Sequence, residues 1–254
     1  MTLEALTSYD ELVAASAGDP FVRWMVDRRR PVRAWGLGPG VAWVRRTPHW
    51  RDNLTVVATP DVAAARLPEL LALAGDVRRI TVPFGTLPRL DDALAARIVP
   101  GIGDDWEWML TATAPPAPDV LVEPVGAGRL PDVTDLLARS SPRHSATVAD
   151  PGVVAWLGVR DGARLVACAA VEEDPPGVPG LASIATDPAY RGRGLGAAVT
   201  AAATRWAFER GHEVVTLGMY SDNTVARRLY RRLGFGGDHR WSSRGLAAPP
   251  PPPS

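Results

Sequence analysis

The sequence of 254 residues contains no lysine and a single cysteine, Cys168, and its formal net charge at pH 7 is zero. One cysteine excludes an intramolecular disulfide and a cysteine-rich metal site, and its position within a strand pattern suggests the core rather than a nucleophile. Balanced charge gives no general attraction to nucleic acid or to an anionic membrane. All 28 basic residues are therefore arginines, which, with abundant alanine and proline, indicates GC-rich coding rather than a functional arginine surface.

Two kinds of targeting segment are also missing from the sequence. The first residues, Met1 to Ala5, lack the basic region and apolar core that a signal peptide has. No apolar run reaches the ~18 residues that a membrane-spanning helix requires. We therefore expect a cytoplasmic protein with an ordinary globular core, since 46% of its residues are hydrophobic and 22% are charged.

The most informative stretch is residues 184–198, which reads as a short apolar strand, a glycine-rich loop and the start of a helix. The loop has glycine at alternate positions, and no Ser, Thr, Asp or Asn stands where it could cap the following helix. An uncapped helix start leaves backbone N–H groups free, and Arg191 and Arg193 add positive charge. The stretch therefore predicts an anion site, most naturally for phosphate.

Residues 192–197 also fit the dinucleotide-binding pattern G-x-G-x-x-A, which is a weak signal on its own. In a dinucleotide-binding loop the first glycine directly follows the strand, whereas here Asp187 to Arg191 intervene. Too few residues follow the loop to complete a doubly wound sheet. A dinucleotide-binding oxidoreductase therefore ranks third, behind the two functions discussed below.

A second motif follows in residues 223–235, which read Asn-Thr-Val-Ala-Arg-Arg-Leu-Tyr-Arg-Arg-Leu-Gly-Phe. Together with the loop, it resembles the GNAT superfamily of acyl-CoA-dependent N-acetyltransferases, whose two motifs are Arg/Gln-x-x-Gly-x-Gly/Ala and Asn-x-x-Ala-x-x-x-Tyr-x-x-x-Gly-Phe. The resemblance covers residues from about 119 to 246 and implies the GNAT fold, an α/β (α+β) mixed central sheet flanked by helices. The matching residues are Arg191, Gly194, Gly196, Asn223, Ala226, Tyr230, Gly234 and Phe235.

The resemblance also implies acetyl-CoA as the co-substrate and gives roles to individual residues. The pantetheine arm of coenzyme A would pair like an extra strand with the strand before the loop. By analogy Asn223 hydrogen-bonds that arm, and Tyr230 donates a proton to the departing thiolate. The residues that would bind the coenzyme, through the strand and then through the backbone N–H groups of the loop at the pyrophosphate, are Ile184, Ala185, Thr186, Arg191, Gly192, Arg193, Gly194, Leu195, Gly196 and Ala197.

The catalytic base is harder to assign from the sequence. The strand 181–186 has no carboxylate, although many relatives of the family place a glutamate there. Glu172 and Glu173, at the end of the preceding strand, are the nearest candidates, and His144 and Asp150 in a polar stretch are others. The missing strand carboxylate keeps open an alternative function, a non-catalytic acyl-CoA-binding sensor or regulatory module.

The order of elements predicts an internal repeat in which the first half lacks the glycine loop and has Thr59 to Ala63 in its place. The first half is expected to contain a hairpin (32–44), a strand (54–58), a helix (61–74) kinked or split by Pro68, a strand (77–82), a helix (90–98) and a strand (106–112). The second half is expected to contain a strand (120–125), a helix (130–138), a hairpin (153–171), a strand (181–186), a helix (195–210), a strand (214–219), a helix (223–233) capped by Ser221 or Asp222, and a strand (241–243).

We therefore expect two tandem GNAT-like halves. Residues 1–113 would form a degenerate domain without the coenzyme motif, 114–118 a linker, 119–246 the acetyltransferase domain, and 247–254 a disordered proline-rich tail. The expected reaction is transfer of an acetyl group from acetyl-CoA to an amine of a small molecule, amino acid or peptide by direct attack. The expected partner is that amine acceptor, with no nucleic acid, no membrane and no metal, and the chain would be a monomer or a homodimer.

Overall fold

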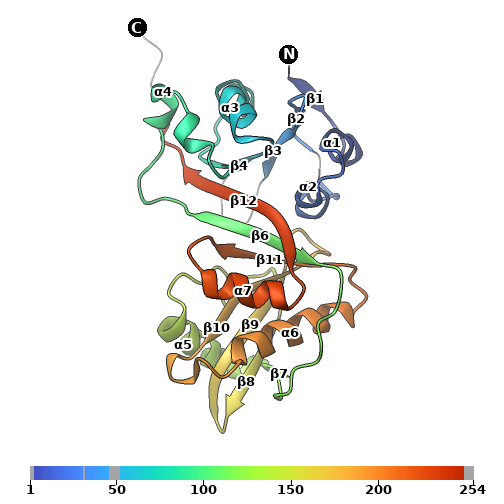
Figure 1. The fold of residues 1–254 in the computed structure, drawn as a ribbon, viewed down its shortest axis with the longest axis vertical. Helices are drawn as coiled ribbons and strands as arrows, with labels where there is room; N and C mark the ends of the chain where they lie inside the picture. Colours follow the sequence, from blue (N-terminus) through green and yellow to red (C-terminus); the bar gives the residue numbers. More distant parts are fainter. Residues whose placement is uncertain (1–2, 31, 46–51, 249–254) are drawn as a thin grey trace. The chain divides into compact units, whose positions relative to one another are not determined.

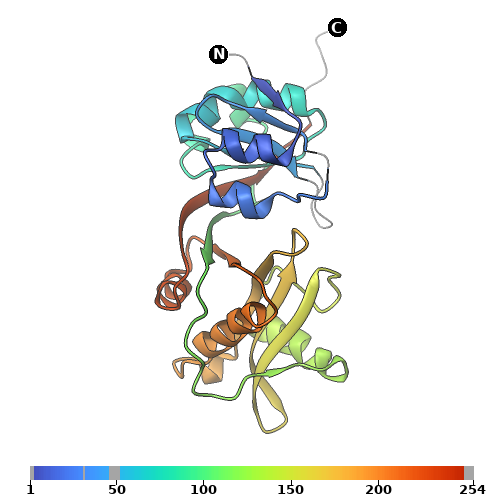
Figure 2. The same ribbon diagram turned by 90° about the vertical axis from the view of Figure 1, so that its right-hand side faces the viewer.

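The structure, a computed structural model, describes residues 3–30, 32–45 and 52–248. Contacts divide these residues into two compact units (Figures 1 and 2). Unit 1 holds the described residues up to Glu107 together with 220–222 and those from His239 onward, and unit 2 holds 108–219 and 223–238. Within the described ranges, no helix is both long enough and apolar enough to cross a membrane.

Unit 2 is built on a mixed sheet with the strand order β6-β11-β10-β9-β8-β7. Its antiparallel part runs through β7 (Glu123–Pro124), β8 (Val153–Asp161), β9 (Arg164–Glu173) and β10 (Pro179–Thr186). β11 (Val215–Tyr220) then pairs with β10 in parallel, and β6 (Asp105–Thr111) follows it. A parallel pair needs a crossover connection, which α6 (Leu195–Phe208) provides.

Helices cover both faces of this sheet. Alternate residues of β9 point to opposite faces, so Ala169 packs in the cluster that contains α6, whereas Cys168 and Ala170 pack in the cluster that contains α5 (Leu130–Ser140). The α6 residues Val199, Ala203 and Ala207 are fully buried at helical spacing, as the sequence pattern requires. α7 (Thr224–Arg232) joins the same cluster as α6 through Tyr230.

Unit 1 repeats this plan around a sheet whose order is β1-β2-β3-β4-β5-β12. Its pairs are antiparallel except for β4 and β5, which are parallel and connected through α3. The buried core of this unit packs α3 against β4 and β5 through Leu67, Leu54 and Ile80. The elements are β1 (Glu4–Leu6), α1 (Tyr9–Ala15), α2 (Pro20–Met25), β2 (Ala34–Gly36), β3 (Val41–Arg45), β4 (Asn53–Val57), α3 (Pro60–Ala74), β5 (Arg79–Pro83), α4 (Asp92–Ala95) and β12 (Gly236–Gly245).

The expected repeat is confirmed, because each unit has a hairpin, a strand, a crossover helix and a parallel strand in the same sheet order. The last strand of each half departs from the expected boundary at residue 113. β12 follows α7 in the sequence, yet its residues Trp241 to Gly245 pair with β5 in unit 1. Residues 108–111 of β6, which end the first half, belong to unit 2, where β6 neighbours β11. Each compact unit is thus completed by a strand from the other half of the sequence.

Several local predictions need correction. Pro68 does not split α3, which continues as one helix while Leu67, Leu70 and Leu71 stay buried around it. The predicted strand 120–125 forms only at β7, because Leu121 is 74% exposed and the pairing with β8 is confined to Glu123 and Pro124. The helix expected over 90–98 is shorter and starts after its cap, Asp91. The end of the predicted proline-rich tail, residues 249–254, lies outside the described residues.

Candidate functional site

The candidate site begins where β10 and β11 separate. These parallel strands are paired at Gly180↔Thr216 and Leu181↔Leu217, and within the described residues no further pair continues this ladder. β10 nevertheless runs on to Thr186 and β11 to Tyr220. The backbone groups of β10 that face β11 beyond Leu181 are therefore not used by that strand. Such an edge is what an extended ligand needs in order to pair like a strand.

A β-bulge marks the same part of β10. The register against β9 shifts between Ala182 and Ala185, and Ser183 inside the shift has φ +48°. A bulge places two successive side chains on one face of the sheet. Ala182 and Ala185 both join the cluster around α5, while Ile184 packs on the α6 side. Of the predicted strand residues, Ala185 is buried and Ile184 and Thr186 are half-buried.

The glycine loop connects β10 to α6. Gly192 and Gly194 both have φ +77°, and Gly194 is the N-cap residue of α6 without any side-chain cap. The first intrahelical bond that involves Gly194 runs from the Ala198 N–H to the Gly194 carbonyl. The N–H groups of residues 195–197 precede that bond, so they point out of the helix start. The uncapped helix start that the sequence predicts is thus confirmed, and anion binding there stays a prediction.

The two arginines of the loop are exposed and are held by backbone oxygens. Arg191 donates to the Ser140 carbonyl at 3.1 Å, which places it beside the end of α5. Arg193 lies over the ring of Tyr190 with its guanidinium carbon 4.8 Å from the ring centroid. Leu195 is buried beneath the loop, and the predicted residues Gly196 and Ala197 are half-buried. The positive charges therefore stand at the surface around the helix start.

Asp187 anchors the loop, although the sequence reasoning did not single it out. It is 2% exposed, and its carboxylate faces Arg139 Nε at 3.0 Å and Arg164 at 2.6 Å. The other carboxylate oxygen accepts a bond from the Ala189 N–H, which starts the short turn at residues 188–190. Desolvation would raise the pKa of this carboxyl, but the Ala189 N–H and the two arginines outweigh it and lower the pKa to about 2. The Asp-Pro pair at 187–188 is a turn signal that could have revealed this role.

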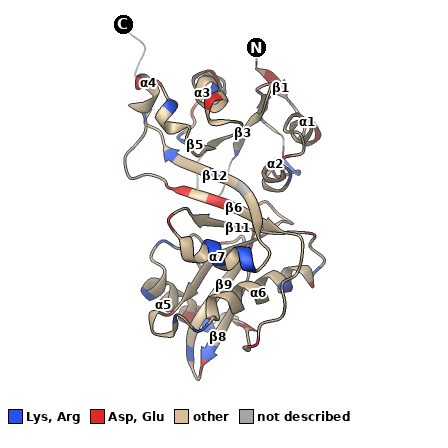
Figure 3. Cartoon of the chain, in the orientation of Figure 1, with Lys and Arg blue, Asp and Glu red and all other residues tan. Residues whose placement is uncertain are grey.

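α7 carries the second motif. Asn223 is exposed, and its side-chain oxygen accepts a bond from the Ala226 N–H at 3.0 Å. Asn223 therefore caps α7 itself, which corrects the expectation that Ser221 or Asp222 would do so. Tyr230 is 7% exposed and packs edge-on against Phe235. Burial raises the pKa of Tyr230 to about 12, so its phenol is protonated at neutral pH. Arginines make the rest of the helix strongly basic (Figure 3).

The structure separates the two glutamates that the sequence groups together. They are adjacent in β9, so their side chains point to opposite faces. Glu173 accepts a bond from the Gly177 N–H and lies 3.7 Å from His212, which follows α6. A Cβ atom added to Gly180 would lie 3.5 Å from both Glu172 Cγ and Thr216 Oγ1. Glu172 therefore lies beside β10 and β11 on the α5 face, at Gly180, just before the stretch 181–186 that has no carboxylate.

His144 and Asp150 lie in the segment that joins α5 to β8. His144 Nδ1 is 2.8 Å from the Ser141 carbonyl oxygen. Since a carbonyl only accepts, Nδ1 carries the proton, and Nε2 of the neutral ring is left with a lone pair. Asp150 accepts a bond from the Thr147 N–H at 2.6 Å. Cys168 is fully buried and its pKa is raised to about 12 by desolvation, which confirms the prediction that it belongs to the core.

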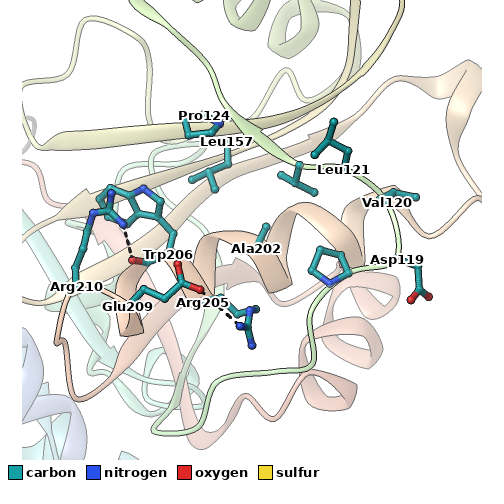
Figure 4. Close-up of a pocket in the computed structure, with 12 residues that line it drawn as sticks. Asp119, Val120, Leu121, Pro124, Leu157, Ala202, Arg205, Trp206, Glu209 and Arg210 are labelled. Atoms are coloured by element: carbon teal, nitrogen blue, oxygen red, sulfur yellow. Dashed lines mark hydrogen bonds and ion pairs between the residues drawn. The ribbon is translucent and has the colours of Figure 1, made fainter.

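A separate cavity of about 670 Å³ lies at the far end of α6 (Figure 4). The segment 118–122 and the last turns of α6 line it, with Trp206 and Leu157 supplying apolar surface. Arg210 stacks on Trp206, and Arg205 is paired with Glu209. At 1.5 Å per residue, Trp206 is roughly 18 Å along the helix from Gly194. This cavity is therefore distinct from the glycine loop.

Comparison with known proteins adds independent information. The family model described as Acetyltransferase (GNAT) family matches residues 128–235. A mycothiol acetyltransferase from Sanguibacter keddieii is 33% identical over 204 residues, which are 72% of this chain and 60% of that protein. One from Rhodococcus erythropolis is 41% identical over 66 residues, which are 26% of this chain and 22% of that protein. The chain thus spans less than two thirds of the length of these relatives.

Solved structures give the same fold. A putative GNAT-family acetyltransferase from Novosphingobium aromaticivorans matches with a TM-score of 0.53 and 24% identity, covering 93% of this chain and 97% of that one. A GCN5-related N-acetyltransferase from Sphaerobacter thermophilus matches with a TM-score of 0.56 and 19% identity, covering 81% of this chain and 76% of that one. At these identities the likeness concerns the fold.

Proposed function

Because residues 128–235 are a domain of the acetyltransferase (GNAT) family, we propose that the chain transfers an acetyl group from acetyl-CoA to an amine. One observation carries the proposal. The uncapped start of α6 lies beside Thr186, at the end of the part of β10 that does not pair with β11, since a Cβ atom added to Gly196 would lie 3.5 Å from Thr186 Oγ1. The two features together suit an anionic group joined to an extended, amide-bearing arm, which is the chemistry of coenzyme A.

The residues present fit this co-substrate. The N–H groups of residues 195–197 would hold the pyrophosphate, helped by Gly192 and Gly194, which adopt positive φ and have no Cβ atom to obstruct the ligand. The free edge of β10 at Ile184 to Thr186 would hold the arm, and the exposed Asn223 keeps its amide nitrogen for the same purpose, since its oxygen caps α7. When bound, acetyl-CoA supplies a thioester carbonyl that an amine can attack.

Side chains of the protein would then donate and accept the protons that the reaction transfers. The amine nitrogen forms a bond to the carbonyl carbon, the C–S bond breaks, and the sulfur takes a proton from Tyr230. With its pKa raised to about 12 by burial, the phenol of Tyr230 is protonated at neutral pH and so has a proton to donate. The proton lost by the amine needs a base, for which Glu172, on the α5 face beside Gly180, is better placed than Glu173. His144, through Nε2, is another candidate, as is Asp150.

The identity of the amine acceptor has to come from a panel of candidate amines. The names of the relatives associate them with mycothiol, so mycothiol-related amines belong in an acceptor panel beside small amines, amino acids and peptide N-termini. The test incubates the chain with acetyl-CoA and each amine, and follows release of the free thiol together with the acetylated amine. We expect thiol release that depends on one class of amine. Equimolar binding of acetyl-CoA with no thiol release from any amine would favour the alternative, a non-catalytic acyl-CoA-binding module.

A further inference from the structure

Ser183 occupies a conformation that L-amino acids seldom adopt. It lies in the bulge of β10 with φ +48°, and its side chain is 8% exposed. A residue with a Cβ atom is disfavoured there, so a compensating interaction has to hold it. None of the sequence motifs includes this residue.

The compensation comes from a pair of hydrogen bonds to a single residue, Ala146. The Ser183 hydroxyl donates to the Ala146 carbonyl at 2.7 Å and accepts from the Ala146 N–H at 2.8 Å. Ala146 is 1% exposed, so without the Ser183 hydroxyl its N–H and its carbonyl would both be buried without these hydrogen bonds. The Ser183 side chain therefore satisfies both backbone groups of Ala146, as a neighbouring strand would in a sheet.

These two hydrogen bonds, called the hydroxyl tie below, attach the segment 141–150 to β10. Ala146 lies between His144 and Thr147, whose N–H bonds to Asp150. It packs in the same cluster as Ala182 and Ala185, on the α5 face of β10. That face also carries Glu172 beside Gly180. The segment 141–150 thus lies against the α5 face of the bulge, whereas the glycine loop follows the end of the strand.

We propose that Ser183 is a positioning residue that fixes the segment 141–150 as one wall of the amine-acceptor site. The expected change in kinetics rests on the proposed acetyl transfer, whereas the hydrogen bonds between Ser183 and Ala146 do not depend on it. The Ser183 hydroxyl acts through Ala146, to which both of its hydrogen bonds go. Its loss is therefore expected to alter use of the acceptor and to leave the binding of acetyl-CoA unchanged.

Two variants separate the hydroxyl from the backbone strain. Ser183→Ala removes the hydroxyl and keeps a Cβ at positive φ, whereas Ser183→Gly removes the hydroxyl and relieves the strain. We expect the glycine variant to melt at a higher temperature than the alanine variant. Both should raise the KM for the amine at least about tenfold, while the KM for acetyl-CoA stays within about twofold of the wild-type value. An unchanged KM for the amine in both variants would overturn the proposal.

Hydrogen exchange tests the hydroxyl tie without any need for turnover. In the Ser183→Gly variant the amide of Ala146 should exchange at least about tenfold faster than in the wild type, together with its neighbours in 141–150. Unchanged exchange across this segment would contradict the inference even if acetyl transfer is found. Ala17→Gly is the control, since it relieves a positive φ of 54° in unit 1 and should alter neither the exchange of this segment nor the KM for the amine.

Discussion

Asp187 and Arg139 are joined by an ion pair of 3.0 Å that connects the end of β10 to the last turn of α5. Arg139 also donates to the Leu165 carbonyl, and Arg164 meets the same carboxylate oxygen at 2.6 Å. The carboxylate is 3% exposed, and it stands four residues before the loop that would hold the coenzyme. The loop is therefore anchored on its strand side by a charge that two arginines and the Ala189 N–H share.

This anchor predicts how stability depends on pH. The pKa of Asp187 in the folded protein is about 2, below the ordinary value of 3.8, so the carboxylate stabilises the fold above pH 4 and loses that contribution as pH falls from about 4 to 2. The Asp187→Asn variant should have a lower Tm than the wild type at pH 7, and the gap should shrink towards pH 2. Asp61→Asn is the control, because its ion pair with Arg89 is at the surface. A gap that does not depend on pH would contradict the anchoring role.

The glycine loop offers a test of coenzyme binding. Gly194→Ala places a Cβ at φ +77°, where an L-residue costs about 1–2 kcal/mol, so the loop should leave its present conformation. We expect the affinity for acetyl-CoA, measured by calorimetry, to fall about tenfold. Gly162→Ala introduces a similar strain at φ 56° in the turn between β8 and β9, and should lower Tm without changing that affinity. Equal affinities in the two variants would show that the loop does not bind the coenzyme.

Unit 1 should not bind acetyl-CoA, because the start of its crossover helix is already occupied. Thr59 caps α3 by accepting from the Val62 N–H, and Pro60 has no N–H to offer. The carboxylate of Asp61, paired with Arg89, puts a negative charge in the first turn of α3, which disfavours a phosphate there. Calorimetry with the full chain should therefore give one equivalent of acetyl-CoA per chain. Two equivalents would contradict the assignment of a single working loop.

The sequence predicted the parts of this site that depend on local pattern. The glycine loop, the uncapped start of α6 and the Asn/Tyr helix all follow from residue types at short spacing, and the structure has each of them. The cap of α7 was missed because Ser221, Asp222 and Asn223 are all good caps, and the choice depends on where the helix begins.

Long-range features were beyond the reach of the sequence. β12 pairs with β5, which lies about 160 residues earlier in the sequence. No local pattern shows whether this last strand will join β5 of the first half or β11 of the second. The bulge at Ser183 was likewise hidden, since serine at positive φ is stabilised by Ala146, a residue far away in the chain. Glu172 and Glu173 were grouped together because both lie at the end of one strand, and the positions of α5 and α6 were needed to show which face each side chain joins.

The central claim, that unit 2 transfers an acetyl group with Tyr230 as the proton donor, is tested most directly by turnover of Tyr230→Phe. The change removes the hydroxyl and keeps the ring that packs against Phe235, so Tm and the affinity for acetyl-CoA should match the wild-type values. With the amine that gives the fastest thiol release, kcat should fall about 100-fold, as expected for loss of a general acid. A variant that releases thiol at the wild-type rate would contradict the claim.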